Sequence, residues 1–150
     1  MTVPFISVKQ LDHAIDLPLP TRQTPGSSGC DVCAAISSDI ILHPNERSLV
    51  PTGLVLDIPI GFEVQVRPRS GLAYKHGVTV LNSPGTIDSD YRGEVKILLI
   101  NHGVQSFTIK RGERIAQLVP SRVCHDVSFI QVSHVTDSIR GPGGFGSTGV

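Results

Sequence analysis

The sequence predicts an all-β, single-domain protein arranged as a sandwich or barrel. Short apolar runs recur along the chain, and turn residues separate them about every 8–12 positions, a spacing typical of such folds. Within 62–67 the apolar residues alternate with polar ones, as on a strand with one buried face. No stretch of a dozen residues keeps the apolar period of an α-helix. The length of 150 residues suits one domain that buries a core without staples.

Strand-like segments run along the chain as far as residue 132. They are, in order, 5–11, 30–36, 39–43, 47–52, 54–59, 62–68, 78–82, 94–101, 106–110, 114–120 and 127–132. Segment 70–77 suits one or two helical turns, with Ser70 as the N-cap and Gly77 as the end. We expect a β-domain over 1–137 and a flexible, glycine-rich arm over 138–150.

Charge and hydropathy exclude several classes of protein. The formal net charge is +0, so no broad basic face for nucleic acid is expected. The apolar runs fall short of the roughly 20 residues that cross a bilayer, and the first residues lack the pattern of a signal peptide. Three cysteines, an odd number, suit a reducing compartment. We therefore expect a cytoplasmic protein whose partners include neither nucleic acid nor membrane.

Cys30 and Cys33 form a C-x-x-C pair that invites a redox or zinc interpretation. On a strand, a spacing of three places the two thiols on opposite faces, with Cα atoms roughly 10 Å apart, beyond the reach of a disulfide. Zinc would need two further ligands, and only Cys124 and His125 offer themselves, without a matching spacing. We therefore predict structural thiols.

Segment 67–77 (RPRSGLAYKHG) is a candidate phosphate site. The N–H groups at a helix start, together with the Arg69 guanidinium and the Ser70 hydroxyl, would form a cradle for an anion. Gly71 would let a ligand approach the backbone closely. The alternative is a strand, a tight turn and a solvated arginine.

Segment 78–95 has the pattern of a hairpin. Pro84 and Gly85 suit the central positions of a type II turn. On a regular returning strand Asp88 and Asp90 share one face and Tyr91 takes the other, so a site using Asp88 and Tyr91 together requires a bulge or bend. The alternative is an exposed hairpin with solvated acids.

The C-terminal segment 140–149 (RGPGGFGSTG) can be a disordered end. However, an arginine and two hydroxyls can bind phosphates, and a lone aromatic ring can stack on a base.

Five segments together resemble, in order and spacing, the motifs of the trimeric dUTP pyrophosphatases (dUTPases). They are SGCDVCAA (28–35), PRSGLA (68–73), NSPGTIDSDYRGEV (82–95), RGERIAQL (111–118) and RGPGGFGSTG (140–149). The resemblance covers Gly29 to Gly149. One motif would be weak, but five in register are highly specific. The departures are mild: Cys30 and Cys33 stand where other small, apolar or polar residues are common.

The resemblance implies a homotrimer of jelly-roll-like (β-clip) subunits with sites at the subunit interfaces. It implies hydrolysis of dUTP to dUMP and pyrophosphate with Mg²⁺ as cofactor. This reaction limits uracil incorporation into DNA and supplies dUMP for thymidylate synthesis.

The resemblance also implies roles for individual residues. Asp88 would activate the water that attacks the α-phosphorus, and Asp31 would reach the metal only through water. The substrate-binding residues would be Asn82, Thr86, Ile87 and Asp88 at the uracil; Tyr91 at the deoxyribose; Arg69, Ser70, Gly71 and Gln117 at the phosphates; Phe145 over the base; Arg140, Gly146, Ser147 and Thr148 on the phosphates; and Lys96 near the base-reading segment.

Two other functions remain open from the sequence. A dCTP deaminase of the same fold would release ammonia rather than pyrophosphate. A nucleotide-sensing protein could keep every binding motif and act on a regulatory partner.

Overall fold

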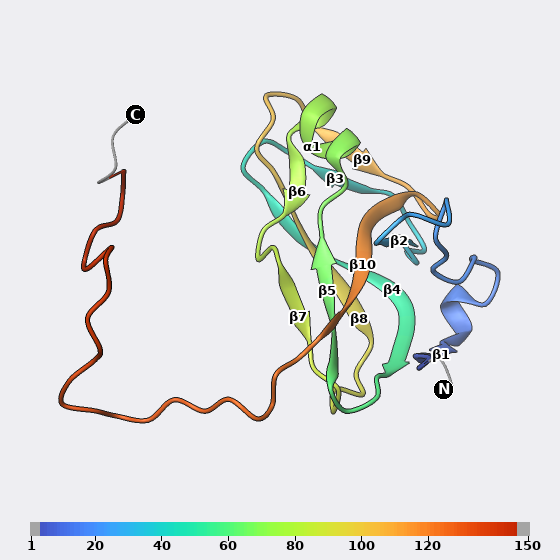
Figure 1. Cartoon of the computed structure of the whole chain (residues 1–150). Helices are drawn as coiled ribbons and strands as arrows, with labels where there is room; N and C mark the ends of the chain where they lie inside the picture. The colour runs from blue at the N-terminus through green and yellow to red at the C-terminus, as the bar shows by residue number, and fades with distance from the viewer. Residues whose placement is uncertain (1–3, 147–150) are drawn as a thin grey trace.

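The computed structural model describes residues 4–146 of the chain and confirms the predicted all-β fold (Figure 1). The strands are β1 (Ser7–Gln10), β2 (Cys30–Cys33), β3 (Ile40–Leu42), β4 (Arg47–Asp57), β5 (Phe62–Arg67), β6 (Val78–Val80), β7 (Gly85–Ile87), β8 (Val95–Asn101), β9 (Phe107–Ile109) and β10 (Arg114–Arg122). A 3-10 turn, η1 (Asp12–Ala14), and one helix, α1 (Ser70–His76), complete the described elements.

Two four-stranded sheets enclose the core. One has the strand order β1-β4-β8-β6 and the other β2-β10-β5-β7, while β3 and β9 form a separate pair. One buried cluster draws on both sheets, with Val95, Ile97 and Leu99 from β8 and Val64 and Val66 from β5 among its members. Alternation along each strand places these side chains inward and their neighbours outward, as period-2 patterning requires.

The predicted break between 47–52 and 54–59 is wrong, because the single strand β4 runs from Arg47 through the break to Asp57. The register of β4 against β8 shifts between Pro51 and Leu54, which is a β-bulge. Gly53 adopts φ 66° there, and the Thr52 hydroxyl donates to Val95 O at 2.6 Å. Residues typical of a turn therefore bend the strand without ending it.

The predicted hairpin over 78–95 is also wrong. Strand β6 pairs with β8, whereas β7 pairs with β5 in the other sheet. Gly85 is the first residue of β7 and lacks the positive φ that a type II turn requires at its third position. The segment Leu81–Pro84 thus connects two sheets, since each arm finds its partner elsewhere in the core.

Helix α1 occupies the predicted segment and ends, as predicted, at Gly77 in the left-handed conformation (φ 70°). Its N-cap is Arg69, so the prediction of Ser70 is wrong; Ser70 is the first helical residue. A backbone bond from Ala73 N–H to Arg69 O, at 3.1 Å, starts the helix one residue earlier than expected.

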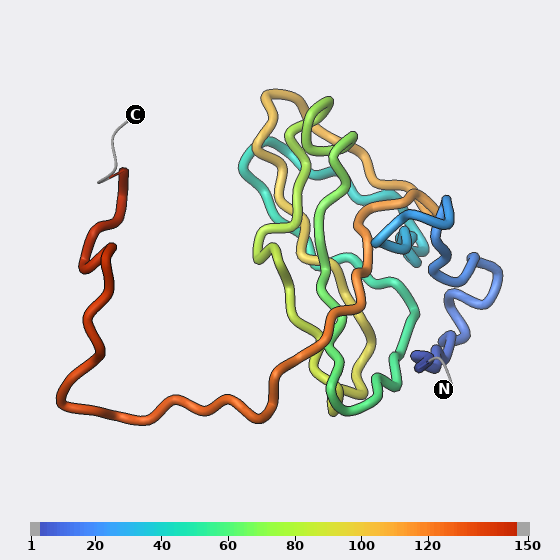
Figure 2. Tube along the Cα trace, viewed as in Figure 1, coloured from blue at the N-terminus to red at the C-terminus, as the bar shows by residue number. Residues whose placement is uncertain are grey.

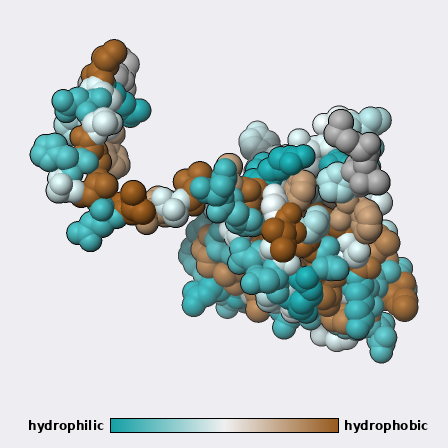
Figure 3. Space-filling view, turned by 60° about the horizontal axis from the view of Figure 1, so that its bottom comes forward, coloured by the Kyte–Doolittle hydropathy of each residue, from teal (hydrophilic) through white to brown (hydrophobic). Residues whose placement is uncertain are grey.

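The chain after β10 leaves the sheets and extends beside them (Figures 1 and 2). The predicted strand at 127–132 is wrong: this segment has no strand partner among the described residues. Its apolar side chains, including Phe129 and Ile130, are exposed on the projecting segment (Figure 3). An alternating pattern of apolar and polar residues becomes a strand only where a neighbouring strand forms backbone hydrogen bonds with it.

The three cysteines are free, with Cys33 buried and Cys124 exposed. Within residues 4–146, no helix is long and apolar enough to cross a membrane.

Candidate active site

The predicted base and sugar residues line one cavity of about 480 Å³, to which both β7 and β8 contribute residues. Its lining includes Asn82, Thr86, Ile87, Asp88, Tyr91 and Lys96. Thr86 and Ile87 lie on β7, and Lys96 lies on β8. The structure thus brings together residues from the segments on either side of the Asp88–Glu94 loop.

Asp88 and Tyr91 share this cavity because the chain turns after β7. The backbone N–H of Tyr91 donates to Asp88 O at 3.2 Å, and both residues are exposed. The bend that the sequence required for a joint site is therefore confirmed. A carboxylate beside an aromatic ring can act on a water molecule while the ring contacts an apolar part of a ligand.

Two residues that the sequence did not indicate help to hold Tyr91. Its hydroxyl donates to the backbone carbonyl of Glu94 at 3.0 Å. Its ring passes so close to Gly93 that a Cβ at residue 93 would collide with the phenol oxygen and Cζ. The glycine after "YR" was the available sequence signal, since close approach of a ring to the backbone needs this residue type.

The predicted phosphate residues form a second group at the start of α1. The Asp31 carboxylate, 17% exposed, accepts from Arg69 Nε at 3.1 Å and from Arg114 Nη1 at 3.2 Å. Gln117 Nε2 donates to Pro68 O at 3.0 Å, which places its side chain beside the segment that leads into α1. Arg114 is an addition to the predicted set. The positive charge of two guanidiniums beside one carboxylate suits an anion.

Ser70 and Gly71 lie exposed on the first turn of α1, next to this group. No atom outside its own helix and chain neighbours lies within 4 Å of the position that a Cβ of Gly71 would occupy, so that side of its backbone is open.

The C-terminal residues form a third group, apart from the other two (Figure 1). Arg140 Nε donates to Gly143 O at 2.8 Å within the segment itself. Phe145 is fully exposed, and Gly146 adopts φ 83°. Ser147 and Thr148 lie outside the described residues. One chain therefore does not bring Arg140, Phe145 and Gly146 to the cavity or to the pair formed by Arg69 and Arg114.

The family model described as dUTPase matches residues 16–149. The deoxyuridine 5'-triphosphate nucleotidohydrolase of Rhizobium rhizogenes is 54% identical over 99% of this chain and 96% of its own length. That of Brucella melitensis is also 54% identical, over 99% of this chain and 95% of its own.

Solved structures agree in fold. The dUTPase of Staphylococcus bacteriophage 80alpha (G164S mutant with dUpNHpp) superposes with a TM-score of 0.86 and 25% identity, over 99% of this chain and 100% of that one. An all-β chain that presents a carboxylate, a tyrosine and a pair of arginines at its surface has side chains that can bind and act on a phosphorylated ligand. The chain belongs to the dUTPase family and is an enzyme of that family. The resemblance drawn from the five motifs is confirmed.

Proposed function

We propose that the protein hydrolyses dUTP to dUMP and pyrophosphate, assisted by Mg²⁺, as a homotrimer with sites between subunits. The observation that carries the proposal is the cavity in which Asp88 and Tyr91 lie together, in a chain of the dUTPase family. In this role the protein would act in the cytoplasm on a free nucleotide, limit uracil incorporation into DNA and supply dUMP for thymidylate synthesis.

Asp88 is the general base of this proposal. The water oxygen attacks the α-phosphorus, and its proton passes to the Asp88 carboxylate. The bond from that phosphorus to the oxygen bridging to the β-phosphate breaks, and pyrophosphate leaves with the electron pair. Positioned base assistance of this kind contributes about 10²–10⁴-fold in rate.

Uracil recognition is assigned to Asn82 and the backbone of β7. In the described sheet β7 is an edge strand, paired only with β5, so one side of its backbone is available to a ligand. Alternating N–H and C=O groups suit uracil O4, N3–H and O2. Cytosine would leave such groups unpaired, and sites built on hydrogen bonds reject such analogues by about 10⁴–10⁵-fold.

The remaining roles in substrate binding are assigned to the residues at the start of α1 and to the C-terminal segment. Arg69, Ser70, Gly71 and Gln117 would bind phosphate oxygens, and Lys96 would lie near the base. Arg140, Gly146, Ser147 and Thr148 would close on the phosphates, with Phe145 over the uracil. Closure of such a segment excludes water from the reacting groups.

The side chains available near the phosphate residues suit a magnesium ion that is bound mainly by the nucleotide. Among residues 4–146 no three His, Cys, Asp or Glu side chains gather as a metal site. The Asp31 carboxylate is already paired with two arginines, so it would reach the ion through water. Mg²⁺ prefers phosphate oxygens and water to an all-protein cage. When bound, it would neutralise charge on the triphosphate.

The position of the C-terminal segment supports sites shared between subunits. This segment lies away from the sheets that carry the cavity and the pair Arg69–Arg114 (Figure 1), so another chain of the proposed trimer would bring the arm to each site.

A nucleotide panel tests the function. Purified protein with Mg²⁺ is given dUTP, dTTP, dCTP or UTP, and pyrophosphate and ammonia are measured together. We expect pyrophosphate from dUTP far above the others. Ammonia from dCTP would replace the proposal with a deaminase. Tight dUTP binding without pyrophosphate would favour a nucleotide sensor.

A further inference from the structure

We infer that Glu94 is a positioning residue: held by His13 and the β4 bulge, it sets the place of the Tyr91 ring and thereby the preference for a 2'-deoxyribose over a ribose. This inference rests on the proposed function, in which Tyr91 lies against the sugar.

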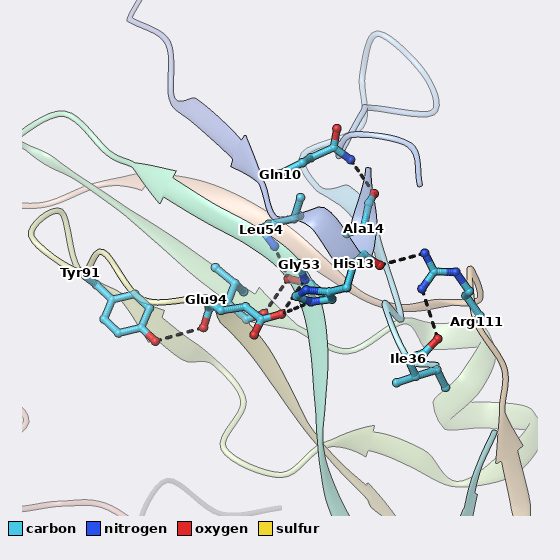
Figure 4. Close-up of polar contacts among 11 residues, drawn as sticks. Gln10, His13, Ala14, Ile36, Gly53, Leu54, Tyr91, Glu94 and Arg111 are labelled. Carbon is cyan, nitrogen blue, oxygen red and sulfur yellow. Dashed lines mark hydrogen bonds and ion pairs between the residues drawn. The ribbon is translucent and has the colours of Figure 1, made fainter. Parts of the chain in front are cut away.

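Two donors from distant parts of the chain hold the carboxylate of Glu94. Its Oε1 accepts from the Gly53 backbone N–H at 2.8 Å and from His13 Nε2 at 2.9 Å (Figure 4). The donors precede Glu94 by 41 and 81 positions in the sequence. The Glu94 side chain is largely buried, with 17% exposure. A charged acceptor with two donors in a partly buried place is held more firmly than a surface ion pair.

The two donors are themselves held in place. Gly53 has φ 66° in the β4 bulge, and a Cβ there would collide with that of Ala14 in η1, so η1 packs directly on the bulge. Leu11 N–H donates to Gly53 O at 2.8 Å, which fixes the entry to η1. Arg111 Nη2 donates to His13 O at 2.9 Å from the other side (Figure 4). Bulges of this kind commonly aim groups at neighbouring sites.

Glu94 transmits this placement to Tyr91 through its own backbone. The Tyr91 hydroxyl donates to Glu94 O at 3.0 Å, and Gly93 lies beneath the ring. The Thr52 hydroxyl donates to the backbone carbonyl of the next residue, Val95, at 2.6 Å. The Glu94 carbonyl therefore lies between two fixed points, the Glu94 side chain and the Val95 carbonyl. Glu94, Tyr91 and Asp88 line the same cavity.

A ring held in this way has a chemical consequence. A ribose adds one hydroxyl where a deoxyribose has hydrogen, and a ring that cannot move away excludes it sterically. If the carbonyl of Glu94 shifts, the ring loses its hydrogen bond and can yield to the extra oxygen. A neutral hydrogen bond contributes about tenfold in an equilibrium, and this is the scale of the change we expect in selectivity.

The test measures kcat/KM for dUTP and for UTP, and takes their ratio. Glu94→Ala removes the acceptor for both donors and should lower the ratio about tenfold, mainly through better use of UTP. Glu94→Gln keeps an oxygen that accepts from Gly53 N–H and should stay within about threefold of the original ratio. Glu46→Ala is the matched control, because Glu46 Oε2 also accepts a backbone N–H, from His43 at 3.0 Å, in an exposed turn.

Because Glu94 also lines the cavity, a double-mutant cycle separates positioning from direct contact. Tyr91→Phe removes the hydrogen bond to Glu94 O while keeping the ring. If Glu94 acts through that bond, Glu94→Ala should change the ratio little further in the Tyr91→Phe background. Additive effects would overturn the inference in favour of a direct contact with substrate.

Stability is followed by thermal unfolding in every variant, since a purely structural role would lower Tm without moving the ratio. Should Glu94→Ala fail to fold, His13→Asn, at a half-exposed position, removes one donor and should lower the ratio in the same direction. An unchanged ratio in His13→Asn and Glu94→Ala would refute the inference. If the unchanged protein makes no pyrophosphate from dUTP, it is the proposed function that fails.

Discussion

Two aromatic residues proposed to meet the nucleotide, Tyr91 and Phe145, are placed in contrasting ways. Tyr91 is 46% exposed, with its hydroxyl on Glu94 O and its ring against Gly93. Phe145 has an exposure of 114% and lies on a glycine-rich segment away from the sheets. One chain is enough to position the first residue. In the proposed function, the second would meet the nucleotide only when the arm closes or another subunit contributes it, and the first would contact the sugar.

The largest expected effect on turnover comes from a substitution in the cavity that contains Tyr91. Asp88→Asn should keep dUTP binding while kcat falls by about 10²–10⁴-fold, because the amide cannot take a proton from water. Steady-state pyrophosphate release measures kcat, and titration with a non-hydrolysable dUTP analogue measures binding. An unchanged kcat would assign the base elsewhere.

Removing residues 140–150 tests the proposed role of the C-terminal segment that carries Phe145. The β-sheets and the oligomer should persist, while turnover falls by about 10²-fold as the reacting groups lose their closure. Sedimentation gives the mass, expected near three times that of one chain, and pyrophosphate release gives the rate. A truncated protein with full turnover would make the segment an ordinary chain end.

Gly93→Ala sharpens the contrast by disturbing only Tyr91. The new Cβ would displace the ring, and we expect kcat/KM for dUTP to fall about tenfold, the scale of one lost contact. Gly26→Ala is the control, since Gly26 has no atom within 4 Å of such a Cβ and no left-handed backbone. Equal rates in the two variants would show that the Tyr91 ring can move without cost.

The smallest expected effect compares two thiols, one in a sheet and one in the trailing segment. Burial raises the pKa of Cys33, so less of it is thiolate at neutral pH than in an ordinary thiol. We expect alkylation of Cys33 to be slow near pH 7, and to accelerate as pH rises through its raised pKa or when the chain unfolds. Exposed Cys124 should react first. Mass spectrometry of timed adducts checks the order, and faster labelling of Cys33 would contradict it.

Local patterns predicted much of this molecule. Alternation within 62–67 marked β5, and Gly77 marked the end of α1, because side-chain burial and a left-handed cap depend on neighbours close in sequence. Predictions failed where a distant partner decided the result. Pro51–Gly53 carries turn residues but forms a bulge, because β8 pairs on both sides of it.

The residues of the candidate site also fall into those expected from the sequence and those that only the structure revealed. Asp88 and Tyr91 were expected together from the resemblance of their motif to the dUTPase family, and both line one cavity. Glu94 and His13 were not, because their relation arises only when η1 packs on the β4 bulge. His13 and Glu94 are 81 positions apart, and their spacing in the sequence does not predict a hydrogen bond between them.

The sequence by itself determined the strand class, which follows from periodicity, and the residue types available for chemistry, which follow from the properties of single side chains. The motifs took their meaning from the resemblance to the dUTPase family. Only the tertiary structure decided that β6 and β7 belong to different sheets, that segment 127–132 has no partner within the described chain, and that Glu94 holds Tyr91. The physical reason is that pairing and packing join backbones far apart in sequence, so their outcome depends on the whole core.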